Sequence, residues 1–232
     1  MPLFRLNEQI AFPHPDLAEE NGLLAIGGDL SPARLLCAYR HGIFPWYGPG
    51  DPLLWWFISP RLVIFPEEFK VPGRLSRYRR KTSLTITFDQ AFAEVIGECA
   101  RIREEGGQGT WITPTMQEAF TRLHRLGYAH SVECRDGERL VGGLYGIALG
   151  QVFFGESMFS RIASASQFAL MALVDILRRK KFRLIDCQMT TQHLLRFGAR
   201  EIGGKEFQAL LKTHIDDLNP QKSWQDEETT PR

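Results

Sequence analysis

Hydrophobic and polar positions between residues 61 and 217 follow two different periods. Short apolar or alternating runs predict strands, and apolar positions three or four residues apart predict helices. The expected strands cover residues 61–65, 83–88, 128–134, 139–149, 151–159, 182–187 and 200–202. The expected helices cover residues 89–105, with Asp89 as the cap, 113–126, 164–181, 191–197 and a segment from 205. This order predicts an α+β fold with a mixed sheet.

The first 60 residues differ from the rest in their density of turn-forming residues. One helix is well signalled among these turns, because Ser31 can cap it, Pro32 suits its first position and Gly42 can end it. We therefore expect a small N-terminal α/β module over residues 1–60 and a second domain over 61–217. Residues 218–232 are acidic and contain few apolar side chains, so they are expected to form a mobile tail.

The element order of the second domain is also that of acetyl-CoA-dependent N-acetyltransferases. We therefore expect an acyltransferase-like domain of the GNAT type, although element order alone does not identify a reaction. An acyl-CoA-dependent N-acetyltransferase is accordingly one alternative function. Against it, residues 161–166 before the helix from 164 read RIASAS and lack the glycine-rich loop that holds a pyrophosphate.

The net charge of +1 conceals an uneven distribution. Residues 70–81 carry six basic side chains and residues 178–183 carry five, so a total of +1 leaves −10 for the rest of the chain. The first run is consistent with RNA or phosphate binding and equally with a solvated surface. The second run ends a predicted helix, where basic residues are common, and a structural role is favoured there.

Cysteine spacing and hydropathy exclude several other classes. The four cysteines include no C-x-x-C pair, so neither a zinc site nor a redox motif is supported. No apolar run is long enough to span a membrane, and the first residues lack a signal-peptide pattern. We therefore expect reduced thiols, a cytoplasmic location, no metal and no membrane contact.

Three segments could carry chemistry. Residues 42–56 contain Trp46 and two further tryptophans in turn-rich sequence, which suits either a pocket or a small satellite core. In a regular strand, Phe154, Glu156 and Met158 share one face, so the carboxylate must face a cleft or meet a cation such as Arg161.

The third segment ends the apolar strand at 182–187. Asp186 and Gln188 are expected on one side of that strand by its period of two. A carboxylate and an amide at a strand end suit catalysis, and capping of the following helix is the structural alternative.

Six blocks together resemble the bacterial leucyl/phenylalanyl-tRNA–protein transferase family. They occur in family order as NGLLAIGGDLSP (21–32), GIFPW (42–46), GTWI (109–112), VGGLYG (141–146), FGESMFSR (154–161) and LIDCQ (184–188). The resemblance implies transfer of Leu or Phe, and sometimes Met, from aminoacyl-tRNA to the N-terminal α-amine of proteins that begin with Arg or Lys. The product is then directed to N-end-rule degradation. Aminoacyl-tRNA is the co-substrate, and no other cofactor is implied.

The resemblance also assigns residues. The catalytic centre would contain Glu156, Asp186 and Gln188. The aminoacyl and adenosine pocket would contain Trp46, Trp111, Phe153, Gly155, Met158, Ser160 and Ile185. The tRNA acceptor stem would contact Arg74, Arg77, Arg80 and Lys81. The chain departs from the family pattern at residues 55–61 and at Gln167, where a lysine is common, and both changes concern tRNA docking.

The reaction suggests a mechanism for these residues. The ester donor is activated and an α-amine has a pKa of about 8, so positioning matters more than strong activation. We expect Gln188 to accept a hydrogen bond from the amine and Asp186 to orient Gln188. The proton acceptor remains open between Asp186, Gln188 and the RNA hydroxyl, and Glu156 could pair with either donor or acceptor. A non-enzymatic RNA-binding module is the remaining alternative, but it leaves these three residues without a role.

Overall fold

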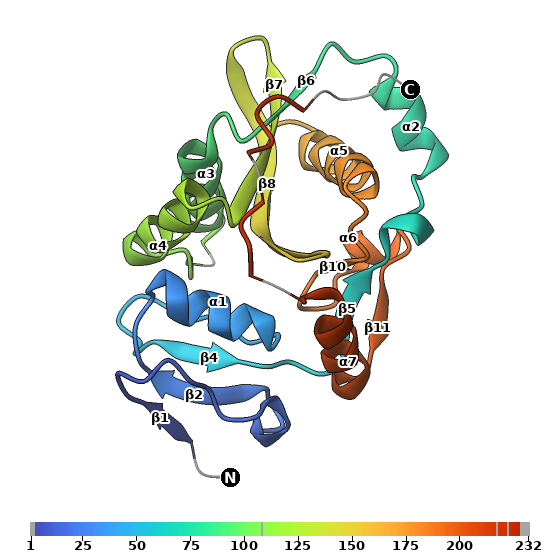
Figure 1. Ribbon diagram of the computed structural model, residues 1–232. Helices are drawn as coiled ribbons and strands as arrows, with labels where there is room; N and C mark the ends of the chain where they lie inside the picture. The colour runs from blue at the N-terminus through green and yellow to red at the C-terminus, as the bar shows by residue number, and fades with distance from the viewer. Residues whose placement is uncertain (1–2, 108, 217, 222, 228–232) are drawn as a thin grey trace.

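The computed structural model describes residues 3–107, 109–216, 218–221 and 223–227, which form two sheets and the helices packed against them (Figure 1). The smaller sheet has the strand order β1-β2-β4-β3, and the larger sheet has the order β11-β5-β10-β9-β8-β7-β6. The chain leaves the smaller sheet after Trp56 and enters the larger sheet at Arg61. The expected α+β fold, with a small N-terminal sheet and a larger second domain, is confirmed.

The smaller sheet and one helix make up the N-terminal part. The strands are β1 (Phe4–Leu6), β2 (Leu23–Gly27), β3 (Phe44–Pro45) and β4 (Leu54–Trp56), with the 3-10 helix η1 (Pro15–Leu17) before β2. Helix α1 (Pro32–Arg40) begins as expected, since Oγ of Ser31 accepts the N–H of Arg34 at 3.4 Å. The helix lies between the smaller sheet and the larger domain (Figure 1), and its buried apolar residues belong to a hydrophobic cluster shared by both.

The larger sheet is antiparallel except where β9 and β10 pair in parallel. Its strands are β5 (Arg61–Ile64), β6 (Thr85–Phe88), β7 (Ala129–Asp136), β8 (Arg139–Leu149), β9 (Val152–Ser160), β10 (Leu184–Asp186) and β11 (Arg200–Ile202). The strand at 139–149 and the one at 200–202 have the expected bounds. The others differ from expectation by at most two residues at each end.

Helices cover both faces of this sheet. Two of them, α3 (Phe92–Glu105) and α4 (Pro114–Arg125), pack on one face, and α5 (Ala165–Arg179) packs on the other (Figure 1). The remaining helices are η2 (Pro66–Glu68), α2 (Gly73–Arg79), α6 (Gln192–Leu195) and α7 (Gly204–His214). The sequence did not predict α2, because Leu75 is its single buried residue and gives no helical period. None of the helices in the described ranges has the length and apolar character needed to cross a membrane.

A β-bulge in β9 changes which of its side chains share a face. The pairing with β8 shifts between Tyr145 and Gly146, so that Glu156 has no residue opposite it. Phe154 packs in the cluster with α3 and α4, whereas Met158 packs in the cluster with α5. The prediction that Phe154, Glu156 and Met158 share one face is therefore wrong, because one extra residue reverses the alternation of the strand.

The parallel pairing of β9 with β10 ends early and leaves an opening in the sheet. Asp186 pairs with Phe154, which is the last pair between these strands. Strand β9 continues to Ser160, whereas the chain after β10 turns away through Gln188, whose φ is 58°. Among the described residues, no strand pairs with the edge of β9 beyond Phe154 on this side.

The predicted cap of the helix at 89–105 lies outside that helix. Helix α3 begins at Phe92, and Ala91 is its N-cap residue. Asp89 has a φ of 55°, and its buried carboxylate accepts hydrogen bonds from His130 and from the N–H of Trp224, both at 2.8 Å. The side chain of Asp89 thus joins distant segments instead of capping a helix.

The segment at the C-terminus also differs from the expectation of a mobile tail over 218–232. Trp224 is fully buried, and the N–H of Gln221 donates to the carbonyl of Gly127 at 2.9 Å. The segment is polar overall, but its one large aromatic side chain, Trp224, packs in the core of the larger domain and anchors the segment there. Residues 217, 222 and 228–232 lie outside the described residues.

Candidate functional site

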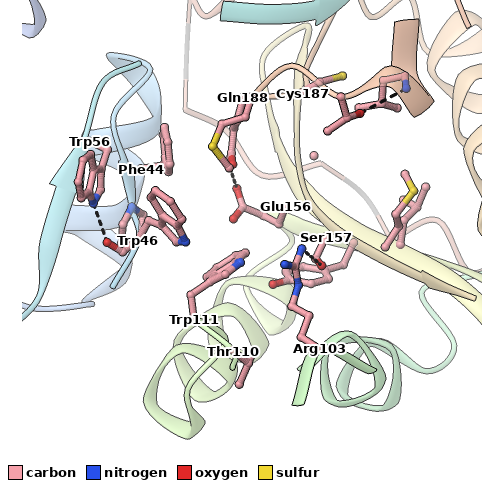
Figure 2. Close-up of a pocket in the computed structure, with 18 of the residues that line it drawn as sticks. Phe44, Trp46, Trp56, Arg103, Thr110, Trp111, Glu156, Ser157, Cys187 and Gln188 are labelled. Carbon is pink, nitrogen blue, oxygen red and sulfur yellow. Dashed lines mark hydrogen bonds between the residues drawn. The ribbon is translucent and has the colours of Figure 1, made fainter. Parts of the chain in front are cut away.

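A cavity of about 870 Å³ lies where the edge of the smaller sheet faces the opening between β9 and β10. Figure 2 shows aromatic side chains from the smaller sheet and from the loop before α4 pointing into the space beside Glu156 and Gln188. Most of the expected pocket residues line this cavity, namely Trp46, Trp111, Phe153, Gly155, Met158 and Ile185. Ser160 is not among the lining residues. Its hydroxyl instead bonds to Ser166 at the start of α5.

The tryptophans of residues 46–56 were expected to form either a pocket or a small satellite core, and they do both. Trp46 and Trp56 line the cavity and meet edge to face at 5.5 Å, and Nε1 of Trp56 donates to the carbonyl of Trp46 at 2.6 Å. Trp55 is fully buried beneath them, and its Nε1 donates to the carbonyl of Gly27 at 2.9 Å. The segment therefore supplies both a cavity wall and a small core.

Glu156 is the buried carboxyl group on the cavity wall. Its Oε1 accepts a hydrogen bond from the hydroxyl of Tyr39 at 2.8 Å. It also accepts one from Nε2 of Gln188 at 3.1 Å (Figure 2). Burial raises the pKa of Glu156 to about 8, assisted by the charge of Asp186 and opposed by the hydrogen bonds and by Arg61. The group can therefore exchange a proton near neutral pH.

Arg161 does not pair with Glu156. Its guanidinium binds Glu98 at 2.7 Å and also Glu105, both on α3. Of the two alternatives expected for Glu156, a cleft or a nearby cation, the cleft is the one observed, because Glu156 lines the cavity. The positive charge of Arg61 also acts on Glu156 and opposes the rise of its pKa.

Asp186 and Gln188 are brought together by a tight turn at the end of β10. The backbone N–H of Gln188 donates to Oδ1 of Asp186 at 2.8 Å, and the carbonyl of Gln188 accepts the N–H of Leu62 at 3.2 Å. A left-handed backbone conformation costs a non-glycine residue about 1–3 kcal/mol unless its surroundings hold it. These two bonds hold Gln188 there, so that its amide reaches Glu156.

Asp186 is fully engaged by Arg61. Nε of Arg61 donates to Oδ1 at 2.8 Å, and Nη2 donates to Oδ2 at 2.6 Å and to the carbonyl of Gly42 at 3.1 Å. The guanidinium also lies over the rings of Phe44 and Phe207, with its carbon 4.9 Å and 4.7 Å from their centroids. Asp186 therefore serves to position the turn, since both of its oxygens already have partners.

Sequence reasoning missed Arg61 and Tyr39 as parts of this site. Tyr39 contributes to the apolar stripe of α1, and its hydroxyl is the signal that could have drawn attention to it. Arg61 begins a hydrophobic strand, where an arginine must find a partner if buried. Neither signal identifies the partner, because the partners are far apart in sequence. Tyr39 and its partner Glu156 are separated by 117 residues, and Arg61 and its partner Asp186 by 125.

The first basic run forms an exposed face next to the cavity. A second cavity of about 840 Å³ is lined by Arg74, Arg77 and Lys81, together with Gln167, Arg196 and His193. His193 lines both cavities, so the basic face leads to the aromatic one. Arg80 is exposed on the same segment but does not line the second cavity.

The second basic run has structural partners. Nε of Arg178 donates to the carbonyl of Pro66 at 2.8 Å, and Arg179 and Lys180 pair with Glu227 at 3.2 Å and 2.7 Å. These contacts agree with the structural interpretation favoured for Arg178, Arg179 and Lys180.

The site combines an apolar chamber with one set of polar atoms. The amide oxygen of Gln188 accepts no hydrogen bond from any side chain or backbone group in the described ranges, and the residue lines the cavity. It can therefore accept a hydrogen bond from a bound amine. A large apolar or aromatic side chain suits the walls, and a polyanion suits the neighbouring basic face.

Known proteins resemble this chain along almost its whole length. A protein of Desulfotalea psychrophila named leucyl/phenylalanyl-tRNA–protein transferase is 58% identical over 224 residues, which cover 97% of this chain and 99% of that one. One of the same name from Syntrophobacter fumaroxidans is 56% identical over 227 residues, covering 98% and 97%.

Solved structures resemble it more distantly. A ribosomal-protein-alanine N-acetyltransferase from Brucella melitensis biovar Abortus 2308 has a TM-score of 0.33 at 14% identity, covering 44% of this chain and 76% of that one. A GCN5-related N-acetyltransferase from Kribbella flavida has a TM-score of 0.34 at 13% identity, covering 74% and 61%.

Family models match both parts of the chain. Residues 28–57 match the model described as the leucyl/phenylalanyl-tRNA protein transferase N-terminal domain. Residues 63–212 match the model described as leucyl/phenylalanyl-tRNA protein transferase. Together with the relatives above, these matches show that the chain belongs to the leucyl/phenylalanyl-tRNA–protein transferase family and is an aminoacyltransferase.

Proposed function

We propose that the protein moves Leu, Phe or Met from aminoacyl-tRNA to the N-terminal α-amine of proteins that begin with Arg or Lys. The modified proteins are then marked for N-end-rule degradation in the cytoplasm. The observation that carries this proposal is the cavity in which aromatic walls meet the amide of Gln188 and the carboxyl group of Glu156. Such a chamber suits an apolar aminoacyl group whose ester must meet an amine.

The aromatic walls support the choice of amino acid. Trp46, Trp111 and Phe153 border the cavity, and Met158 adds an adaptable side chain. Contact area alone separates side chains that differ by one methylene by only about 1–3 kcal/mol. Selection among Leu, Phe and Met therefore depends on the shape of the chamber, whereas charged side chains are rejected by desolvation.

The chemistry is aminolysis of an ester. The neutral α-amine attacks the carbonyl carbon of the aminoacyl group, a C–N bond forms, and the C–O bond to the terminal ribose breaks. Oε1 of Gln188 accepts a hydrogen bond from the amine and holds its lone pair toward the ester. The amine loses one proton, which we assign to the released ribose oxygen, because both oxygens of Asp186 are occupied by Arg61. Asp186 positions Gln188 through its backbone N–H.

Glu156 supports this step in two ways. It fixes the amide of Gln188 by accepting its N–H, which leaves the amide oxygen directed at the amine. When ionised, it also attracts the cationic acceptor. A buried carboxylate is far more effective in this role than one in water, since the local dielectric is low.

The basic face supports tRNA as the carrier of the donor. Arg74, Arg77 and Lys81 line a groove that reaches the aromatic cavity at His193. No ion pair to these three basic side chains is formed within the described part of the chain, so they are available to phosphates. Binding there would release counterions and depend steeply on salt.

Transfer of labelled leucine tests the proposal. Leu-tRNA is incubated with the protein and a peptide that begins with Arg, and the matched peptide begins with Gln. We expect label on the Arg peptide alone, lost after RNase treatment. Acetyl-CoA with the same peptide gives no acetylation. Acetylation without leucine transfer would favour the acyl-CoA alternative, and equal labelling of both peptides would refute the stated acceptor.

A further inference from the structure

The segment that follows α7 places a tryptophan behind the aromatic cavity. Trp224 is fully buried on the side of the sheet covered by α5. Its ring stacks on His130 with centroids 4.0 Å apart and lies 6.0 Å from the ring of Phe153 at a tilt of 30°. Phe153 is itself one of the residues that border the cavity. The ring of Phe153 therefore lies between Trp224 and the cavity.

Phe153 has little freedom to move away from Trp224. A Cβ atom added to Gly146 would lie 2.5 Å from Cε1 of Phe153, which shows how closely the ring packs on the backbone of β8. Trp224 closes another side of the ring. Since protein interiors are densely packed, the position of the Phe153 ring is set jointly by Gly146 and Trp224.

Polar anchors hold Trp224 in place. Its backbone N–H donates to Oδ2 of Asp89 at 2.8 Å, and Nε2 of Gln225 donates to the carbonyl of Asp89 at 3.0 Å. Burial acts to raise the pKa of Asp89, but hydrogen bonds from His130, Trp224 and Ser131 outweigh it and lower that pKa. Asp89 is thus an ionised acceptor at neutral pH. Glu227 adds a second anchor through Lys180 at 2.7 Å.

From this packing we infer that Trp224 is a positioning residue that sets the depth of the aminoacyl pocket through Phe153. The inference rests on the proposed function, which assigns the cavity to the aminoacyl side chain. Replacing Trp224 by a small residue leaves space behind Phe153, into which the ring can withdraw. The pocket then deepens, and kcat/KM for the larger phenylalanyl donor rises relative to kcat/KM for the leucyl donor.

The test compares kcat/KM for Phe-tRNA and Leu-tRNA in the wild-type protein, Trp224→Ala and Trp224→Phe. For Trp224→Ala we expect the Phe/Leu ratio to rise about three- to tenfold, within the range that pocket shape supplies. Trp224→Phe should raise the ratio by a smaller amount, because its ring fills only part of the space behind Phe153. Leu123→Ala serves as the matched control, because Leu123 is fully buried in α4 and belongs to the other hydrophobic cluster. It should lower stability without changing the ratio.

The outcomes separate this inference from the proposed function. If the wild-type protein transfers neither residue, the proposed function fails. If it transfers both, and Trp224→Ala and Trp224→Phe retain the wild-type ratio or shift it toward Leu, the inference is overturned. If Trp224→Ala does not fold, Trp224→Phe decides, since a smaller ring should still raise the ratio above the wild-type value.

Discussion

Arg61 and Asp186 form a two-point ion pair in which neither side chain is exposed to solvent. The pair joins the first strand of the larger sheet to the turn that presents Gln188, and its third hydrogen bond reaches Gly42 before β3. Arg61 therefore connects the N-terminal part of the chain to the larger domain beside Asp186 and Gln188. A buried pair of this kind is costly to break, because the remaining charge loses its partner but stays out of water.

Replacing Arg61 alone should destabilise the protein strongly. For Arg61→Met we expect a loss of about 3–5 kcal/mol in the free energy of unfolding, because Asp186 is left charged and unpaired. Urea unfolding followed by circular dichroism measures this loss. The double variant Arg61→Met/Asp186→Leu removes both charges and should recover much of it. Equal stability of Arg61→Met and the wild-type protein would contradict the assigned role of the pair.

The pKa of Glu156 predicts how stability depends on pH. Its value of about 8 in the folded protein lies above the ordinary value of 4.5, so the folded state holds a proton that the unfolded state releases between these pH values. This group therefore lowers stability progressively from about pH 4.5 to pH 8, by on the order of 4 kcal/mol at the upper end.

Glu156→Gln should remove this dependence. The amide stays neutral and its oxygen can still accept from Tyr39, so the variant should be more stable than the wild-type protein at pH 8 and similar at pH 4.5. Chemical unfolding at several pH values measures the difference. A wild-type protein whose advantage over the variant grows with pH would show that the carboxylate is stabilised in the fold.

Exchanging charges on α2 and at its C-cap residue should weaken tRNA binding. Arg77→Glu with Arg80→Glu should lower affinity for any tRNA and reduce the slope of log affinity against log salt by about 1–2. Filter binding at several salt concentrations measures both. The charge-matched control Lys205→Glu/Lys212→Glu changes exposed positions on α7 and should have a small effect. Equal losses in the two variants would remove α2 from the specific tRNA site.

Local patterns account for most of the fold. The strand at 139–149 was predictable because its apolar run is long and bounded by turn residues. The bulge at Glu156 was not, since nothing in a single strand shows that its partner shifts by one residue. The burial of Trp224 depends on Asp89 and His130, which lie more than ninety positions away in sequence. Composition alone therefore led to the wrong prediction that the segment around Trp224 is mobile.

The candidate site, like the fold, was predictable from the sequence only in part. Glu156, Asp186 and Gln188 could be selected from the sequence because a polar residue within an apolar strand needs a reason. The geometry adds what the pattern lacks, namely that Arg61 occupies both oxygens of Asp186 and that Tyr39 bonds to Glu156. Under the proposed function, these contacts assign Gln188 to the substrate and leave Glu156 and Asp186 to position it.

The most direct test of the account is the single-turnover rate of leucine transfer by Gln188→Ala, measured beside the affinity for Leu-tRNA. Gln208→Ala on α7 is the matched control, because Gln208 bonds to Asp16 on the surface. We predict that Gln188→Ala slows transfer about a hundredfold or more, as expected for loss of one well-placed hydrogen bond in the transition state, while tRNA affinity stays unchanged. Asp186→Ala should slow transfer as well. A near-normal rate for Gln188→Ala with intact tRNA binding would contradict the account.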